Sequence, residues 1–396
     1  MKRIAQVSIL LTGTLLLGAA IRPRTKSPDG LTVHEWGTFT SIAGKDGLAV
    51  DWLPLDGPSD LPCFVFRFGT NNFKGGLSAK VRMETPVLYF YATRPITLSA
   101  RVRFRGGEIT EWYPQAAVTR ANVPNPFAFG AMRDPDAAGR IEWRNVKVSP
   151  GASEDYPVES SRSHYYAARR TDAAPLESPS QKEKFLFYRG LGSFALPITT
   201  TSSDDGAILV KIPGGDEIGG LVLFVNHGGK VGFRIQTAVG SAVTLTLPSL
   251  DGDVVSLGHE LEHLLSAQGL YPREASAMVE TWRDSWLEEG TRVLYIVPRR
   301  IVDAVLPLEV NPAPRQTVRV FVGRMEVITP GVEKDVRDAL SARDRVTLAK
   351  YGRFLQPISD RILQSTPQGA GRTRIEALLQ SIASARAGDS STCAER

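Results

Sequence analysis

Apolar and polar residues alternate along much of the chain, which predicts β-strands. Residues 96–105 alternate cleanly and place one apolar face toward a core. Residues 31–40 alternate as well, whereas residues 80–91 end in a run that is apolar on both faces, as expected for a buried central strand. Shorter strands are predicted at 108–113, 140–148, 185–188, 208–212, 221–225, 231–236, 243–247, 292–297 and 317–329.

The period changes to that of a helix between residues 254 and 290. Leu257, Leu261 and Leu265 recur at helical spacing, and Gly269 is typical of a helix end. Pro272 suits the first turn of a second helix. The pattern therefore predicts a helical hairpin inserted among strands.

Together the predicted strands and helices indicate an α+β fold that is mainly β. We expect sandwich-like antiparallel sheets, the inserted hairpin at 254–290 and a helical C-terminal segment. The 36 Gly and 26 Pro residues favour such a turn-rich chain. The predicted segments are a signal peptide (1–20), a β-rich domain (31–148), a long loop or linker (149–184), a second β-rich region (185–330) and the helical segment (331–390).

The N-terminus predicts export to the periplasm or the cell exterior. Lys2 and Arg3 precede an uncharged stretch, residues 4–20, that ends in small residues where a signal peptidase would cut. A retained N-terminal anchor is the alternative. Cleavage would lower the net charge from +5 to +3, which is too small to favour a nucleic-acid partner. No later segment approaches 18 apolar residues, so we expect no membrane span in the mature chain.

Residues 259–263 read His-Glu-Leu-Glu-His, which satisfies the H-E-x-x-H pattern. On a helix, His259 and His263 share one face and can bind one zinc ion. Glu260 would then polarise a metal-bound water as the general base of a hydrolase. The same three residues also fit an exposed helix face without a metal, so the expectation is no cofactor, with zinc as the alternative.

A zinc site needs a third ligand, and the sequence offers only weak ones. Arg283 stands 20 residues after the second His, where the thermolysin-like class has a Glu. Glu288 lies 25 residues after it and is the candidate third ligand, with Glu280 as a substitute.

Glu-Trp pairs recur three times, at 35–36, 111–112 and 142–143. On strands, neighbouring residues point to opposite faces, so the pairs fit Trp facing the core and Glu facing solvent. The alternative is a pair of carboxylates with Trp platforms, as in glycoside hydrolysis. The candidates for a binding site are His34, Trp36, Glu111, Trp112 and His164.

The two cysteines, Cys63 and Cys393, leave their pairing open. An oxidising compartment permits a bridge, but free thiols fit the sequence equally well.

Five segments of the chain resemble a family of exported bacterial proteins of uncharacterised activity. They are HEWGTFTS (34–41), METPVLYFY (83–91), TEWYPQA (110–116), FLFYRG (185–190) and TWRDSW (281–286). The resemblance implies export and brings no established ligand or cofactor. It lies outside the H-E-x-x-H residues.

Two functional classes remain from the sequence. The first, which we favour, is a non-catalytic binding or scaffold protein of the cell envelope, with an envelope protein or a glycan as its partner. The alternative is a zinc-dependent, peptidase-like hydrolase that uses residues 259–263.

Overall fold

The computed structural model describes residues 30–55, 61–68, 78–120, 138–159 and 163–389. The predicted signal peptide and Cys393 lie outside these residues. Among them, 15 strands form one large sheet and three form a small one. The main path of the large sheet runs β14 (Lys230–Gln236), β13 (Leu221–His227), β16 (Gly290–Val297), β18 (Gln316–Val327), β1 (Thr32–Ala43), β3 (Val81–Tyr91), β10 (Leu186–Gly192), β5 (Gly107–Tyr113), β7 (Ala138–Val148), β4 (Ile96–Arg105) and β17 (Leu308–Asn311).

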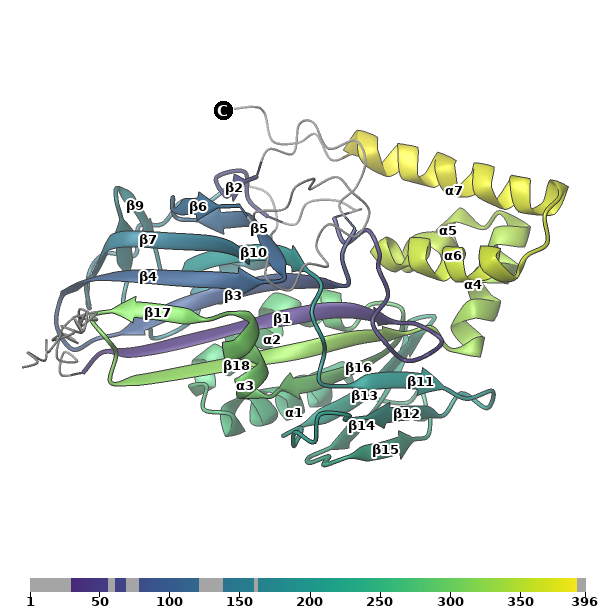
Figure 1. Cartoon of the computed structure of the whole chain (residues 1–396), viewed down its shortest axis with the longest axis horizontal. Coiled ribbons are helices and arrows are strands. Elements are labelled where there is room, and N and C mark those ends of the chain that lie inside the picture. Colours follow the sequence, from purple (N-terminus) through teal and green to yellow (C-terminus); the bar gives the residue numbers. More distant parts are fainter. Residues whose placement is uncertain (1–29, 56–60, 69–77, 121–137, 160–162, 390–396) are drawn as a thin grey trace, which may run out of the picture.

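Short strands extend this sheet, and a separate sheet lies beside it (Figure 1). The added strands are β2 (Phe66–Arg67), β6 (Ala117–Thr119), β8 (Leu176–Ser178) and β9 (Gln181–Glu183). The separate sheet holds β11 (Thr199–Ser202), β12 (Ile208–Lys211) and β15 (Ala242–Leu245). The mainly β fold with its two helical parts is therefore confirmed. Strands from both predicted β-rich regions share the large sheet.

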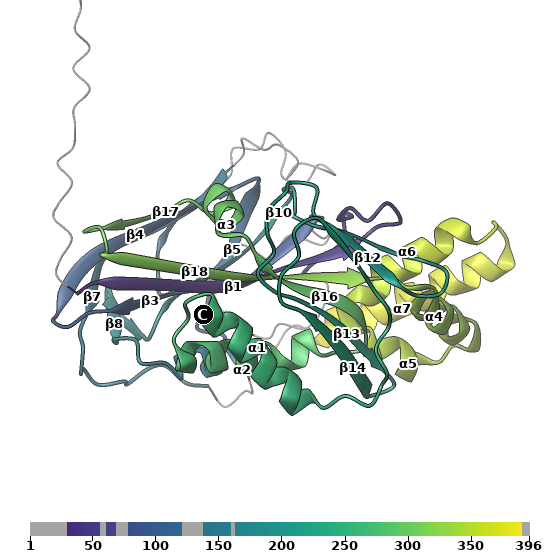
Figure 2. The ribbon, with the colours of Figure 1, turned by 90° about the horizontal axis from the view of Figure 1, so that it is seen from below.

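Nearly all neighbouring strands in the large sheet are antiparallel, but β1 and β18 run parallel over their whole length. Thr32 pairs with Gln316 at one end, and Ala43 pairs with Val327 at the other. This pair lies at the centre of the sheet, where both faces are covered (Figure 2). The residues of β1 are accordingly buried on both faces, as parallel strands usually are.

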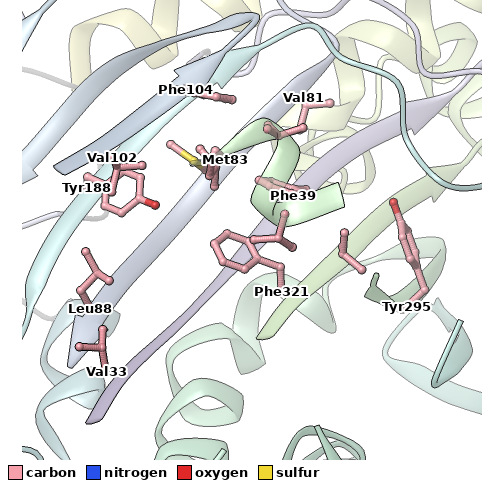
Figure 3. Close-up of a cluster of buried hydrophobic side chains, with 14 of the residues drawn as sticks. Val33, Phe39, Val81, Met83, Leu88, Val102, Phe104, Tyr188, Tyr295 and Phe321 are labelled. Carbon is pink, nitrogen blue, oxygen red and sulfur yellow. The ribbon is translucent and has the colours of Figure 1, made fainter. Parts of the chain in front are cut away.

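The sheet curls so that β4 and β17 lie over β1 and β18 (Figure 2). The short helix α3 (Arg299–Val305) packs against both β4 and β18. The enclosed core is formed by apolar side chains from these strands, including Phe39, Phe104 and Phe321 (Figure 3). The face of 96–105 that was predicted to point inward is buried from Leu98 to Phe104, which confirms that strand.

The predicted helical hairpin is formed by α1 (Val254–Ala267) and α2 (Pro272–Trp286), which cover the outer face of the central strands. Asp253 caps α1 by accepting hydrogen bonds from the backbone N–H groups of Val255 and Ser256. The buried leucines of α1 pack with Trp282 and Trp286 of α2 in a second core. The helical spacing read from the sequence thus places the hairpin correctly.

The C-terminal helices form a third, smaller core with Ile42 and Trp52. Trp52 stacks on Phe354, with ring centroids 5.6 Å apart. The elements are α4 (Pro330–Ala342), α5 (Arg345–Lys350), η4 (Gly352–Phe354), α6 (Leu355–Ser365) and α7 (Ala370–Asp389). No helix of the described residues has the length and apolar composition needed to cross a membrane.

A buried ionic cluster connects these helices to the sheet. The carboxylate of Glu84 on β3, 1% exposed, accepts hydrogen bonds from Arg353 of η4 and from the Thr40 hydroxyl at 3.1 Å. Arg82 lies 3.4 Å from the same carboxylate. Burial by itself raises the pKa of Glu84, but four nearby arginines (Arg353, Arg82, Arg189 and Arg324) together outweigh burial and hold that pKa below its usual value.

Glu84 precedes an irregularity in β3. Thr85 has a φ of 44°, and the pairing with β1 and with β10 shifts register there. Gly37 lies opposite, where an added Cβ would come within 2.8 Å of Phe321 and 3.1 Å of the Pro86 backbone. Glycine is therefore required by close approach, and this bulge re-aims Glu84 toward η4.

Candidate functional site

The H-E-x-x-H residues lie on the solvent face of α1. The side chains of His259, Glu260 and His263 are exposed, while the leucines of the same helix face the core. His259 lies beside Glu262 of the same helix, with 3.8 Å between Nδ1 and Oε2. This placement matches the exposed-face interpretation of the helix.

The two tentative third ligands are engaged elsewhere. Glu288 accepts a hydrogen bond from Arg324 at 2.6 Å, and Glu280 pairs with Arg283 at 3.2 Å. Among the residues that the structure describes, no three His, Cys, Asp or Glu side chains are grouped to hold a metal ion.

The weak binding candidates are dispersed over the fold. Trp36 is fully buried beneath the hairpin, and Glu111 and Trp112 are half-buried on β5. In the sheet, β3 and β10 separate β1 from β5. His164, at the start of η3 (His164–Arg169), is exposed and lies 3.4 Å from Asp284. The structure therefore does not gather these residues into one site.

Two of the Glu-Trp pairs differ in where the Glu points. Glu142 is only 11% exposed and pairs with Arg101 and Arg144 on the outer side of β7, while Trp143 lies in the core. Glu35 is instead fully buried, where it accepts a hydrogen bond from Tyr188 at 2.6 Å and pairs with Arg319. The sequence pattern could not show this, because the partners lie 153 and 284 residues away.

A polar cavity of about 380 Å³ lies where β3 ends, between the 149–184 segment and the start of α2. Its volume is at the low end of the range for small-molecule sites. We call it the polar cavity. Its walls are Tyr91 and Ala92, residues 150–152 with Glu154, Arg169, residues 171–175, Lys184 and Arg273.

Lys184 is the most unusual residue of the polar cavity. Its side chain is only 4% exposed, whereas lysine is rarely buried unless it is paired. Its Nζ donates to the Glu154 carboxylate and, at 3.4 Å, to the backbone carbonyl of Thr171. Glu154 is 54% exposed and belongs to a stretch without regular secondary structure. A buried cation therefore depends on a solvent-exposed carboxylate.

Thr171 contributes a second buried polar group. The residue is 3% exposed, and its hydroxyl has no hydrogen-bond partner among the described residues. Buried hydroxyls are normally hydrogen-bonded, so this one lacks a partner that such a group usually has.

The other cations at the polar cavity are fully engaged. Arg169 donates to both oxygens of the buried Glu183, at 2.9 and 2.7 Å, and to the Pro157 carbonyl at 2.9 Å. The pKa of Glu183 is raised, because the effect of its burial is larger than that of its ion pair with Arg169. The pKa of Arg169 is raised as well, because its ion pair with Glu183 has a larger effect than burial. Arg273 pairs with Asp172 at the exposed rim.

Beneath the polar cavity, His34 is fully buried and paired. Its Nδ1 donates to Glu274 at 2.6 Å, and Glu274 also accepts the backbone N–H of Tyr271 at 2.9 Å, which caps α2. The Tyr91 ring packs against His34 with centroids 5.2 Å apart, and burial together with Glu274 raises the pKa of the Tyr91 phenol. The pair fixes the start of α2, and with it Arg273 at the cavity rim.

Comparison with known proteins identifies no relative by sequence. No family model matches the chain, and no curated protein matches it. Two of the solved structures to which the chain is similar, at 8% identity, are the yeast delta-COP-I mu-homology domain alone and complexed with the Dsl1 WxWxV peptide. Each comparison covers 76% of this chain and 96% of the other, with a TM-score of 0.26. That score is too low to carry an argument about this chain.

Proposed function

We propose that this chain is an exported binding protein of the cell envelope, and that it binds a small polar ligand in the polar cavity. The observation that carries the proposal is the buried ammonium of Lys184 in the lining of the polar cavity, where its ion-pair partner is the solvent-exposed Glu154. Small-molecule sites combine a concave surface with a few placed polar groups of this kind.

Binding rather than turnover fits the ionic groups of the polar cavity, because each is held in an ion pair. Arg169 pairs with Glu183, Lys184 with Glu154, and Arg273 with Asp172. Groups fixed in this way hold and orient a ligand, whereas proton transfer needs a group whose pKa is tuned near the working pH. Export is supported by the basic and apolar pattern of residues 1–20.

Binding is tested by thermal shift with a panel of small polar metabolites and saccharides. A ligand at 100 times its Kd stabilises the folded state by about 2.7 kcal/mol, a clear shift in Tm. Lys184→Met should abolish the shift. Lys182→Met, which changes an exposed lysine two residues away, is the matched control and should leave it intact. A shift that Lys184→Met retains would place the ligand elsewhere.

Export is tested separately, by fractionation of cells that express the full chain. Recovery of the protein outside the cytoplasm, with a new N-terminus near residue 21, is the expected result. Cytoplasmic protein that still begins at Met1 would contradict it.

A further inference from the structure

The buried ammonium of Lys184 is neutralised by a replaceable partner. Glu154 is 54% exposed, and the stretch around it, residues 152–159, has no regular secondary structure. The Glu154 carboxylate is well hydrated once it returns to water, so the cost of its leaving lies in the buried ammonium of Lys184, which is uncompensated until another anion pairs with it. Another carboxylate that enters the polar cavity can take its place on Lys184.

The charges around Lys184 favour a ligand that carries a single negative charge. The guanidinium of Arg169 is saturated by Glu183 and Pro157, so only one buried cation is free to change partners. The carboxylates of Asp172 and of the displaced Glu154 remain at the exposed rim. A phosphate dianion would bring a second negative charge that no buried cation matches, because the remaining cation of the cavity, Arg273, is exposed and already paired with Asp172.

The volume of the polar cavity and its hydrogen-bonding groups restrict the class of ligand further. The volume of about 380 Å³ suits one compact molecule rather than a polymer segment. Thr171 lines the same cavity, its backbone carbonyl lies 3.4 Å from Lys184 Nζ, and its buried hydroxyl has no partner among the described residues. A ligand hydroxyl close to its carboxylate would satisfy that group.

We propose that the polar cavity binds a small hydroxylated carboxylate of about monosaccharide size, whose carboxylate displaces Glu154 from Lys184. The inference rests on the proposed binding function and adds the ligand class and the exchange of partners. Glu154 acts as an internal competitor that keeps Lys184 paired until the acid arrives.

The test is calorimetric titration of the mature protein with D-glucuronate, with its methyl ester and D-glucose as neutral probes, and with inorganic phosphate. We expect D-glucuronate to bind more tightly than any other probe. Glu154→Gln should raise its affinity about tenfold, because the competing carboxylate is gone. Lys184→Met should lower its affinity at least tenfold. Glu177→Gln, which changes an exposed carboxylate on β8 away from the cavity lining, should have no effect.

The possible results separate a failure of the proposed ligand class from a failure of the proposed binding function. Equal binding of D-glucuronate and the neutral probes, lost in Lys184→Met, would retain the binding function and overturn the carboxylate inference. Unchanged or weaker D-glucuronate binding in Glu154→Gln would overturn the displacement. No heat from any probe, in the wild type or in Glu154→Gln, would overturn the inference. The wider thermal-shift panel would then decide on the binding function alone.

Discussion

We predict that Glu84→Gln loosens the attachment of the C-terminal helices to the sheet. The substitution keeps the shape of the side chain and an oxygen for Thr40, but it removes the charge that faces Arg353 and Arg82. The Glu84 side chain is 1% exposed, and those of Arg82 and Arg353 are 14% and 15% exposed. The pairs are therefore poorly screened by solvent.

The magnitude follows from this burial. Breaking a buried ion pair by removing one partner costs about 3–5 kcal/mol, because the remaining charge is left uncompensated. Since Gln retains one acceptor, we expect the lower end, about 3 kcal/mol. That corresponds to roughly a hundredfold change in the equilibrium between the attached and detached helices.

Hydrogen exchange of the backbone amides measures this equilibrium directly. Amides of α4 and α6 should exchange roughly a hundredfold faster in Glu84→Gln than in the wild type. Glu309→Gln is the matched control, because its carboxylate is 64% exposed and pairs with Arg101 at 3.0 Å. It should change stability by less than about 1 kcal/mol. Exchange in α4 and α6 that is equal in the two variants would refute the assigned role of Glu84.

Three further predictions follow from the same structure. The folded pKa of Glu84 lies below its usual value of 4.5, so Glu84 stabilises the folded state above that pH, and this stabilisation is lost as the pH falls through the folded pKa. Urea unfolding midpoints measured between pH 6 and pH 3 should therefore fall more steeply in the wild type than in Glu84→Gln. His259→Ala/His263→Ala should leave the metal content, measured by elemental mass spectrometry, and the Tm unchanged, because both imidazoles are exposed; one zinc per chain, lost in the double variant, would restore the hydrolase alternative. Leu261→Ala should lower the free energy of unfolding by about 2–5 kcal/mol. On the same helix Val255 is 65% exposed, so Val255→Ala should change the free energy of unfolding by less than about 0.5 kcal/mol. Equal losses of stability in urea unfolding would contradict the orientation of α1.

Local periodicity was sufficient to predict the main elements, because each depends on which side chains face the core. The stripe of Leu257, Leu261 and Leu265 predicts α1, and alternation from Leu98 to Phe104 predicts β4. The ionic contacts depend instead on pairing between distant strands. His34 and Glu274 are 240 residues apart, and Glu84 and Arg353 are 269 apart, so no local pattern could connect them.

The candidate site was partly visible in the sequence. Most of the residues that line the polar cavity belong to the polar stretch 149–184, which was predicted as a long loop or linker. Long polar loops carry function disproportionately, and that was the available signal. The resemblance segments had a structural meaning as well, because four of them form the neighbouring strands β1, β3, β10 and β5 and the fifth ends α2. The burial of Lys184 could not be read from the sequence, since its contacts, Glu154 and Thr171, lie 30 and 13 residues away and come together only in the fold.

The parallel pairing of β1 with β18 has a consequence for the order in which the chain acquires its structure. Thr32 pairs with Gln316, so the first strand of the sheet has to wait for a partner that lies 284 residues later in the chain. Contacts of such long range slow folding, because the entropy of closing the loop is lost before any contact forms. The central sheet therefore closes late during biosynthesis. Until residues 316–327 emerge, one edge of β1 stays open to pairing with another chain, so the nascent protein depends on whatever protects that edge.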